Sequence, residues 1–289
     1  MLAVMAGQGE LPKLLIDQLD ADGTPFRLCE MEGFSSDVRG DRPLIRFRIE
    51  TLGSFIAELK KLDVSQICFA GSVARPPLDP SKIDAATLPL VPRMMAALQS
   101  GDDAALRLVL GFFDEAGIAP VGVHELRTDL LPTAGVLGAH QPEDRHGADA
   151  ARGIEIIGAM ARVDVGQSCI VANGQALAIE ALPGTDWMMQ SLMTENTPLS
   201  PDLMAQVIGY GGSLQRSKTL PAGGILVKAS KPGQELRIDM PVIGPDTVRR
   251  AVQVQLEGIV IEQGRVMVLD APTCIEIADR HGLFLQVIG

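Results

Sequence analysis

The sequence is poor in aromatic residues and in positive charge. Tryptophan and tyrosine occur once each, and aromatic residues make up 3% of the chain. A hydrophobic core must therefore be built from Leu, Ile, Val, Ala and Met. The net charge of −11 argues against nucleic-acid binding, which needs clustered Lys and Arg to displace counterions. A few cations in one cleft can still bind phosphate, because the local field matters more than the total charge.

Cysteine is scarce, and long apolar runs are absent. Cys29, Cys68, Cys169 and Cys274 lie far apart without metal-type spacing, so we expect buried, free thiols in a reducing compartment. No run approaches the ~20 apolar residues that span a bilayer, and residues 1–6 are too short for a signal peptide. We therefore expect a cytoplasmic protein whose membrane contact, if any, is peripheral.

What is present indicates an α/β protein of two domains. The length of 289 residues, with 46% hydrophobic and 21% charged residues, is typical of a globular chain with more than one core. Strand-like and helical segments alternate through the N-terminal third, which predicts a Rossmann-like domain with a mostly parallel sheet. The expected strands are 2–6, 25–32, 44–49, 66–73 and 118–125, and the expected helices are 13–21, 51–62 and 103–117.

The second half reads as another α/β domain. Pro, Gly, His and charges mix without periodicity near residues 128–148, so we place the N-terminal domain at 1–130, a linker at 131–148 and the C-terminal domain at 149–289. Residues 194–222 are polar and rich in Gly, Ser and Pro, and read as a flexible excursion. The expected strands are 168–174, 176–182, 224–229, 236–244, 258–264 and 266–271, and the expected helices are 149–164, 185–193, 245–255 and 272–282.

Two glycine turns in the N-terminal domain are candidate ligand sites. In "MAGQGELP", Gly7 and Gly9 match the first two positions of the dinucleotide fingerprint, but Pro12 occupies the third. With Glu30 at the spacing of a ribose-binding acid, a tight turn, a phosphate contact at a helix N-terminus and an NAD site all stay open. In "FAGSVARPP", Gly71 and Arg75 follow the expected central strand, at the edge where such sheets bind ligands.

Further polar residues follow or begin expected elements. Glu180 ends an apolar strand, where a carboxylate needs a partner or a ligand. Gly184, Thr185 and Asp186 lead into a helix and read as a cap or an anion-binding end. In "GDDAALR", the acidic pair reads as a helix cap or as ligands of a divalent cation. The Met-rich "WMMQSLM" reads as core packing or as the lining of an acyl-chain groove.

The stretch "KPGQELRIDMPVIGPDT" sets a carboxylate in an apolar, strand-like run. Period-two alternation would put Arg237 and Asp239 on one face, roughly 6–7 Å apart. Lys228, Lys231 and Gln234 precede them. An ion pair would explain two charges, whereas a site for an anion and a metal would also explain the excess of cations.

These motifs resemble those of a known family. The stretch "KASKPGQELRIDMPVIGPDT" resembles the signature of the UDP-2,3-diacylglucosamine pyrophosphatases of the LpxI type, and "AGQGELP", "FAGSVARP", "GDDAALR", "RVDVGQ" and "LAIEALPGTD" follow the expected order. The resemblance implies hydrolysis of UDP-2,3-diacylglucosamine to UMP and 2,3-diacylglucosamine 1-phosphate in lipid A biosynthesis. It also implies a divalent cation, usually Mg²⁺, two domains enclosing the substrate, and an essential aspartate at Asp239. Pro183, Trp187 and the long 194–222 segment depart from the family pattern.

We therefore expect Asp239 to be the catalytic residue and the metal ligand. Lys228, Lys231 and Arg237 would hold phosphate oxygens. A UDP-linked diacylated sugar is the expected partner, while a peripheral inner-membrane contact and a homo-oligomer stay open. An NAD-dependent oxidoreductase, a non-catalytic nucleotide-sugar sensor and a sugar–nucleotide transferase are the alternatives. The remaining expected substrate-binding residues are Gly7, Gly9, Gly71, Arg75, Glu180, Gly184, Thr185, Asp186 and Gln234.

Overall fold

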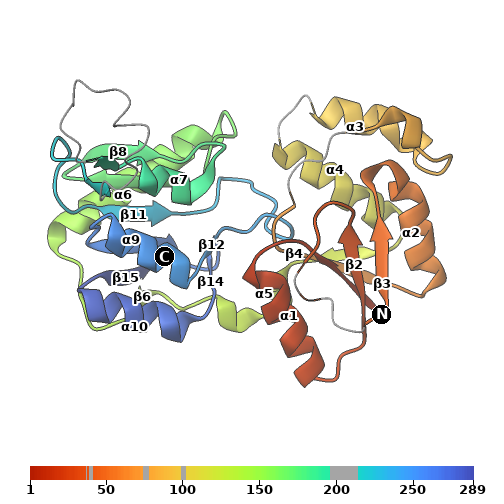
Figure 1. Cartoon of the computed structure of the whole chain (residues 1–289), viewed down its shortest axis with the longest axis horizontal. Coiled ribbons are helices and arrows are strands. Elements are labelled where there is room, and N and C mark those ends of the chain that lie inside the picture. The colour runs from red at the N-terminus through yellow and green to blue at the C-terminus, as the bar shows by residue number, and fades with distance from the viewer. Residues whose placement is uncertain (37, 39–41, 74–77, 99–101, 196–213) are drawn as a thin grey trace, which may run out of the picture. The chain divides into compact units, whose positions relative to one another are not determined.

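The computed structural model describes the chain except residues 37, 39–41, 74–77, 99–101 and 196–213 (Figure 1). It divides into two compact units. Unit 1 contains Met1–Asp129 and Gln234–Met240, and unit 2 contains Leu130–Gly233 and Pro241–Gly289. The expected linker, 131–148, holds strand β6 (Gly135–Val136) and the start of helix α6 (Asp144–Ala161). The boundaries at 130 and 149 stay a prediction.

Unit 1 contains the expected Rossmann-like sheet. Five parallel strands lie in the order β3-β2-β1-β4-β5. The order reverses beside β1, because the chain builds outward to β3 and then returns to add β4 on the other side of β1. Central strands of such sheets are apolar throughout because both faces are covered, and all five residues of β1 are buried. The strands are β1 (Leu2–Ala6), β2 (Phe26–Met31), β3 (Leu44–Phe47), β4 (Gln66–Ala70) and β5 (Ala119–Val121).

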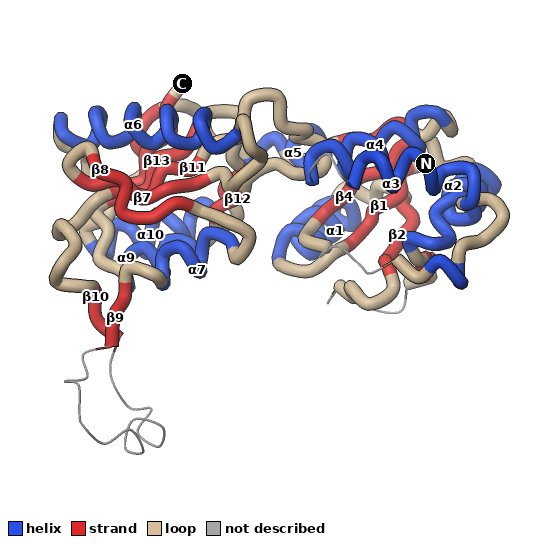
Figure 2. Tube along the Cα trace, turned by 90° about the horizontal axis from the view of Figure 1, so that it is seen from above, coloured by secondary structure: helices blue, strands red, loops and turns tan. Residues whose placement is uncertain are grey.

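Helices cover both faces of this sheet (Figure 2). Phe55 of α2 stacks on Phe47 of β3 with ring centroids 4.0 Å apart, and meets Phe113 of α4 edge-on at 6.2 Å. Helix α1 buries Leu15 and Leu19. Helix α3, which the sequence analysis missed, packs beside α4. The helices are α1 (Glu10–Ala21), α2 (Leu52–Lys61), α3 (Val91–Leu98), α4 (Asp102–Glu115) and α5 (Val123–Leu126).

Unit 2 is built on a six-stranded mixed sheet of order β6-β15-β13-β11-β7-β8. β11, β13 and β15 are parallel, while β7, β8 and β6 run antiparallel to their neighbours. The sequence analysis missed β15, although it lies inside the sheet. The larger strands are β7 (Ser168–Ala172), β8 (Gln175–Ile179), β11 (Ile225–Lys228), β13 (Gly258–Glu262) and β15 (Phe284–Ile288). Two smaller sheets pair β9 (Met193–Glu195) with β10 (Leu214–Arg216) and β12 (Val242–Ile243) with β14 (Met267–Val268).

Helix α6 covers one face of this sheet, and α7 (Gly184–Gln190), α9 (Pro245–Gln253) and α10 (Ala271–His281) cover the other (Figure 2). Met188 and Met189 of α7 are fully buried in the core of the second face. The Met-rich motif therefore supplies core packing, and its two central methionines line no acyl-chain groove. No helix in the described part of either unit is long and apolar enough to cross a membrane.

The strand expected at 236–244 is wrong. Residues 236–238 form a turn, and only β12 at the end of the stretch is extended in a sheet. Ile238 N and Asp239 N lie 3.4 and 3.1 Å from Glu235 O, so the backbone bonds locally. The polar side chains of this stretch supply further local bonds, which compete with the ladder bonds that a strand needs.

Candidate functional site

The loops after β1 and β4 press against each other. Gly7 N donates to Ala70 O at 2.8 Å, and Gln8 and Ser72 exchange two backbone hydrogen bonds of 2.9 Å. A Cβ atom on Gly7 would lie 2.5 Å from Ser72 O, and one on Gly71 would lie 2.5 Å from Gln8 O. Only glycine fits at both positions. The contact stands at the carboxyl ends of the strands where the order reverses, which is where open α/β sheets bind ligands.

The N-terminus of helix α1 has open space beside it, but the residues there do not match the dinucleotide-binding fingerprint. Gly9 caps α1 with a φ of 94°, and a Cβ built there meets nothing within 4 Å. Pro12 is buried in the first turn of α1 and lies against Gly71. Glu30 is 1% exposed and accepts hydrogen bonds from Ser36 N and Oγ at 2.9 and 2.8 Å. These contacts give Glu30 a structural partner, which disfavours a ribose-binding role.

Three of the predicted residues form one hydrogen-bonded chain in unit 2. Lys228 Nζ donates to Thr185 Oγ1 at 2.9 Å, and Thr185 Oγ1 donates to Glu180 Oε1 at 2.9 Å. Ser168 Oγ and Gln167 N donate to Glu180 Oε2 at 2.7 and 3.2 Å. Glu180 and Lys228 are 8% and 6% exposed. This buried polar chain joins β7, β11 and α7 to Glu180, the residue after β8. The charges of Glu180 and Lys228 compensate each other within the protein.

The other predicted residues of unit 2 are close in sequence to Thr185 or Lys228, but their contacts described below lie outside this hydrogen-bonded chain. Gly184 begins α7 with a φ of 88°, and Asp186 is exposed in its first turn. Lys231 forms an ion pair with Asp164. Arg75 of unit 1 lies outside the described residues.

In unit 1, Gln234 holds Asp239. The Gln234 Nε2 group, on a side chain only 8% exposed, donates to both the main-chain oxygen and Oδ2 of Asp239, each at 2.7 Å. Asp239 itself is half-buried. The orientation of this carboxylate is therefore set by a residue five positions earlier, which the sequence analysis had assigned to substrate binding.

Arg237 faces Glu235. Its Nε and Nη2 donate to Glu235 Oε1 and Oε2 at 2.9 Å each, and Nη1 lies 3.8 Å from Asp114 Oδ2. These hydrogen bonds raise the pKa of Arg237 and lower the pKa of Glu235. Glu235 N also donates to Asp103 Oδ1 at 3.1 Å, and Asp103 Oδ2 accepts from Arg107 Nε at 2.7 Å. The sequence analysis missed Glu235 and Arg107, although opposite charges two residues apart are a signal for pairing within a turn.

Comparison with known proteins identifies the family of this chain. A model described as the LpxI N-terminal domain matches residues 1–130, and one described as the LpxI C-terminal domain matches residues 133–286. The chain belongs to the LpxI family. One relative within it is the UDP-2,3-diacylglucosamine pyrophosphatase LpxI of Caulobacter vibrioides, which is 34% identical over 284 residues, covering 98% of this chain and 96% of the relative.

Among the described residues of this LpxI-family chain, no group of three or more His, Cys, Asp and Glu side chains could hold a metal ion. A dedicated protein cage is not required for Mg²⁺, which is usually bound through one or two carboxylates, waters and substrate phosphates. Asp239 suits that kind of site, because it is a half-buried carboxylate with a fixed orientation.

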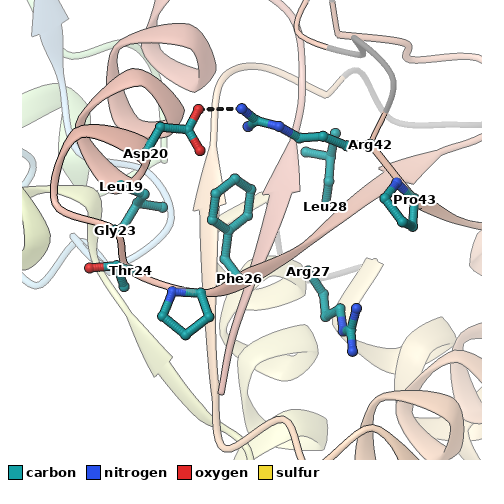
Figure 3. A pocket seen from close by; sticks show the side chains of 10 residues that line it. Leu19, Asp20, Gly23, Thr24, Phe26, Arg27, Leu28, Arg42 and Pro43 are labelled. Atoms are coloured by element: carbon teal, nitrogen blue, oxygen red, sulfur yellow. Dashed lines mark hydrogen bonds and ion pairs between the residues drawn. The ribbon is translucent and has the colours of Figure 1, made fainter.

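The best-defined cavity in the described part of the chain belongs to a different region. It measures about 320 Å³ and lies in unit 1 beside Phe26 and Arg27, where β2 begins (Figure 3). Arg42 pairs with Asp20 there and sits 5.4 Å from the centre of the Phe26 ring. The glycine turns follow the carboxyl ends of parallel strands, whereas this cavity lies where a strand begins. It therefore lies at the amino-terminal end of the strands, away from the glycine turns.

Proposed function

We propose that this chain hydrolyses the diphosphate bond of UDP-2,3-diacylglucosamine to UMP and 2,3-diacylglucosamine 1-phosphate in lipid A biosynthesis. The observation that carries the proposal is the 34% identity, over 98% of the chain, to a relative named for that activity. The matches to both LpxI domain models, at residues 1–130 and 133–286, support it.

Asp239 is the proposed catalytic residue. Cleavage of a phosphoanhydride needs charge neutralisation, alignment and a positioned water more than covalent help. Asp239 would hold a divalent cation such as Mg²⁺ or orient the attacking water. When bound, Mg²⁺ would polarise phosphoryl oxygens and help position the nucleophile. The two hydrogen bonds from Gln234 support this role, because one holds Oδ2 of the carboxylate and the other holds the main-chain oxygen of the same residue before substrate binds.

The other predicted residues divide into those that face the substrate and those that hold their neighbours. Gly9, at the open start of a 12-residue helix, suits a phosphate contact through backbone N–H groups. Lys231 supplies a cation for the diphosphate. Gln234 acts on Asp239, and Glu180 acts through Thr185 and Lys228. The remaining proposed substrate contacts are Gly7, Gly71, Arg75, Gly184, Thr185, Asp186 and Lys228.

A contact with the cytoplasmic face of the inner membrane follows from the same proposal. Two acyl chains hold such a substrate at a bilayer, because each buried CH₂ contributes about 0.8 kcal/mol to membrane binding. Flotation with vesicles tests this point: the protein should float with vesicles that contain the substrate.

The test of the function is a product assay. Purified chain is incubated with UDP-2,3-diacylglucosamine, with Mg²⁺ or with a chelator, and UMP is measured. We expect UMP and diacylglucosamine 1-phosphate in equal amounts, and a loss of both with the chelator. Binding without turnover would favour a sensor, and transfer of the sugar to an acceptor would favour a transferase. Binding of a nicotinamide cofactor would favour an oxidoreductase. The contacts of Pro12 with Gly71 and of Glu30 with Ser36 argue against that result.

A further inference from the structure

Four charged side chains anchor the segment that carries Asp239 to helix α4. They are Asp103 and Arg107 of the helix, and Glu235 and Arg237 of the segment. Glu235 is the centre of this group. Its main-chain N–H donates to Asp103 Oδ1 at 3.1 Å, and its carboxylate receives both arms of the Arg237 fork at 2.9 Å. Arg107 Nη1 stands 3.8 Å from the same carboxylate. The Glu235 side chain is 13% exposed, so this pairing is partly shielded from water.

Glu235 is also joined directly to Asp239. Its carbonyl oxygen accepts the Asp239 N–H at 3.1 Å and lies 3.4 Å from the Ile238 N–H. The N–H, the carboxylate and the carbonyl of one residue are therefore all engaged. A rotation at residue 235 must move Asp239, because the turn between them is closed by this bond.

The Arg237 fork is occupied in a way that a phosphate would have to disrupt. Bidentate Arg–carboxylate pairs are strong and geometrically specific. With Nε and Nη2 on Glu235 and Nη1 near Asp114, the guanidinium has protein acceptors on both sides. This arrangement suits a brace better than a substrate contact.

We propose that Glu235 and Arg237 are a positioning pair for Asp239, and that Arg237 acts through Glu235 instead of on the substrate phosphates. The inference rests on the proposed role of Asp239. It assigns the pair to the alignment of the carboxylate, so the loss of either partner reduces turnover more than affinity.

A double-mutant cycle tests the pair. Glu235→Gln and Arg237→Gln should each lower kcat by about 10- to 100-fold, because small misplacements of a catalytic group have effects of this size. KM should change less than about threefold, and the double variant should lose no more than either single one, since both remove one interaction. Arg237→Lys should recover little, because lysine keeps the charge without the planar fork.

The matched control is a second bidentate pair, which joins helix α3 to helix α4. Arg93 donates to both carboxylate oxygens of Glu115 at 2.9 and 2.7 Å, and both side chains are exposed. Arg93→Gln and Glu115→Gln should leave kcat unchanged. If Arg237→Gln lowers kcat while Glu235→Gln does not, or if the two losses add, Arg237 acts on the substrate and the inference is wrong.

Hydrogen exchange separates this inference from the proposed function. Amides of Gln234–Met240 should exchange faster in Glu235→Gln and Arg237→Gln than in wild type, and at the wild-type rate in the Arg93 and Glu115 variants. Unchanged exchange overturns the positioning pair even if the enzyme is active. A wild-type chain that releases no UMP, but shows this exchange pattern, overturns the proposed function and upholds the positioning of Asp239.

Discussion

The carbonyl oxygen of Ser72 lies 2.5 Å from the point where a Cβ atom of Gly7 would stand. Gly7→Ala must therefore separate the loops that follow β1 and β4. We expect a loss of about 1–3 kcal/mol in the free energy of unfolding, the usual cost of overpacking, measured by urea denaturation.

Gly111 is the matched control for this prediction. It lies inside helix α4, and a Cβ atom there meets nothing within 4 Å. Gly111→Ala should leave stability unchanged or raise it by up to about 1 kcal/mol, because alanine loses less entropy in a helix. Equal stabilities of the Gly7 and Gly111 variants would contradict the close loop contact.

The buried chain from Lys228 to Glu180 predicts a second stability difference. Lys228→Met removes the cation that donates to Thr185, and should cost about 1–3 kcal/mol, as expected when buried polar groups lose a partner. Lys13→Met removes a Lys–Asp17 pair of 2.7 Å whose lysine is 60% exposed, and should change stability by less than about 0.5 kcal/mol. Thermal unfolding of both variants measures the difference. Equal losses would show that the buried Lys228 contact stabilises the fold no more than the exposed Lys13 pair does.

Glu257 predicts a dependence of stability on pH. Two hydrogen bonds from Arg145 at 2.9 and 3.0 Å, and one from His146 Nε2 at 3.1 Å, hold the pKa of Glu257 at about 2, below its ordinary 4.5. His146 Nδ1 accepts from Glu143 N at 2.9 Å, so Nε2 carries the proton. A depressed native pKa stabilises the fold above the unfolded pKa, and this contribution is lost as pH falls from about 4.5 towards about 2.

Glu257→Gln provides the measurement. The difference in unfolding free energy between wild type and this variant should be largest near pH 7 and should shrink by pH 3. Taking the difference removes most of the effect of other carboxylates that titrate in the same range. A difference that stays constant from pH 7 to pH 3 would contradict the assignment.

The burial of the four cysteines predicts that their thiols are unreactive in the folded protein. All four are buried and free, as expected from their spacing, and burial raises the pKa of each thiol to about 12. The thiolate is the reactive form, so the native protein should not react with a disulfide reagent at pH 8. Four thiols should react after denaturation, and fast labelling of the folded chain would show that one of them is accessible.

Much of the fold could be predicted because the signals were local and repeated. The apolar run of β1, its glycine turn and the helix after it identify a parallel sheet without any long-range information. β15 was missed because only two residues separate it from the last helix, so it was read as the end of the chain instead of a strand. The strand expected at 236–244 failed because period-two alternation over a few residues also occurs in a turn with local hydrogen bonds.

The site was predictable in part. Asp239 was named from the sequence, and so were Glu180, Thr185 and Lys228 of the buried chain, since polar groups beside apolar strands need partners. The anchor of the Asp239 segment could not be found that way. Asp103 and Glu235 are 132 positions apart, and their bond uses a main-chain N–H that carries no residue signature.

The most direct test of the central claim compares UMP release from UDP-2,3-diacylglucosamine by wild type and Asp239→Asn in Mg²⁺. Asparagine keeps the shape of the side chain and an acceptor for Gln234, but it removes the negative charge. The variant should fold and bind substrate as wild type does, while UMP release falls by about 10³-fold or more, as expected when several kcal/mol of charge stabilisation are lost. Turnover within about tenfold of wild type would contradict the role of Asp239.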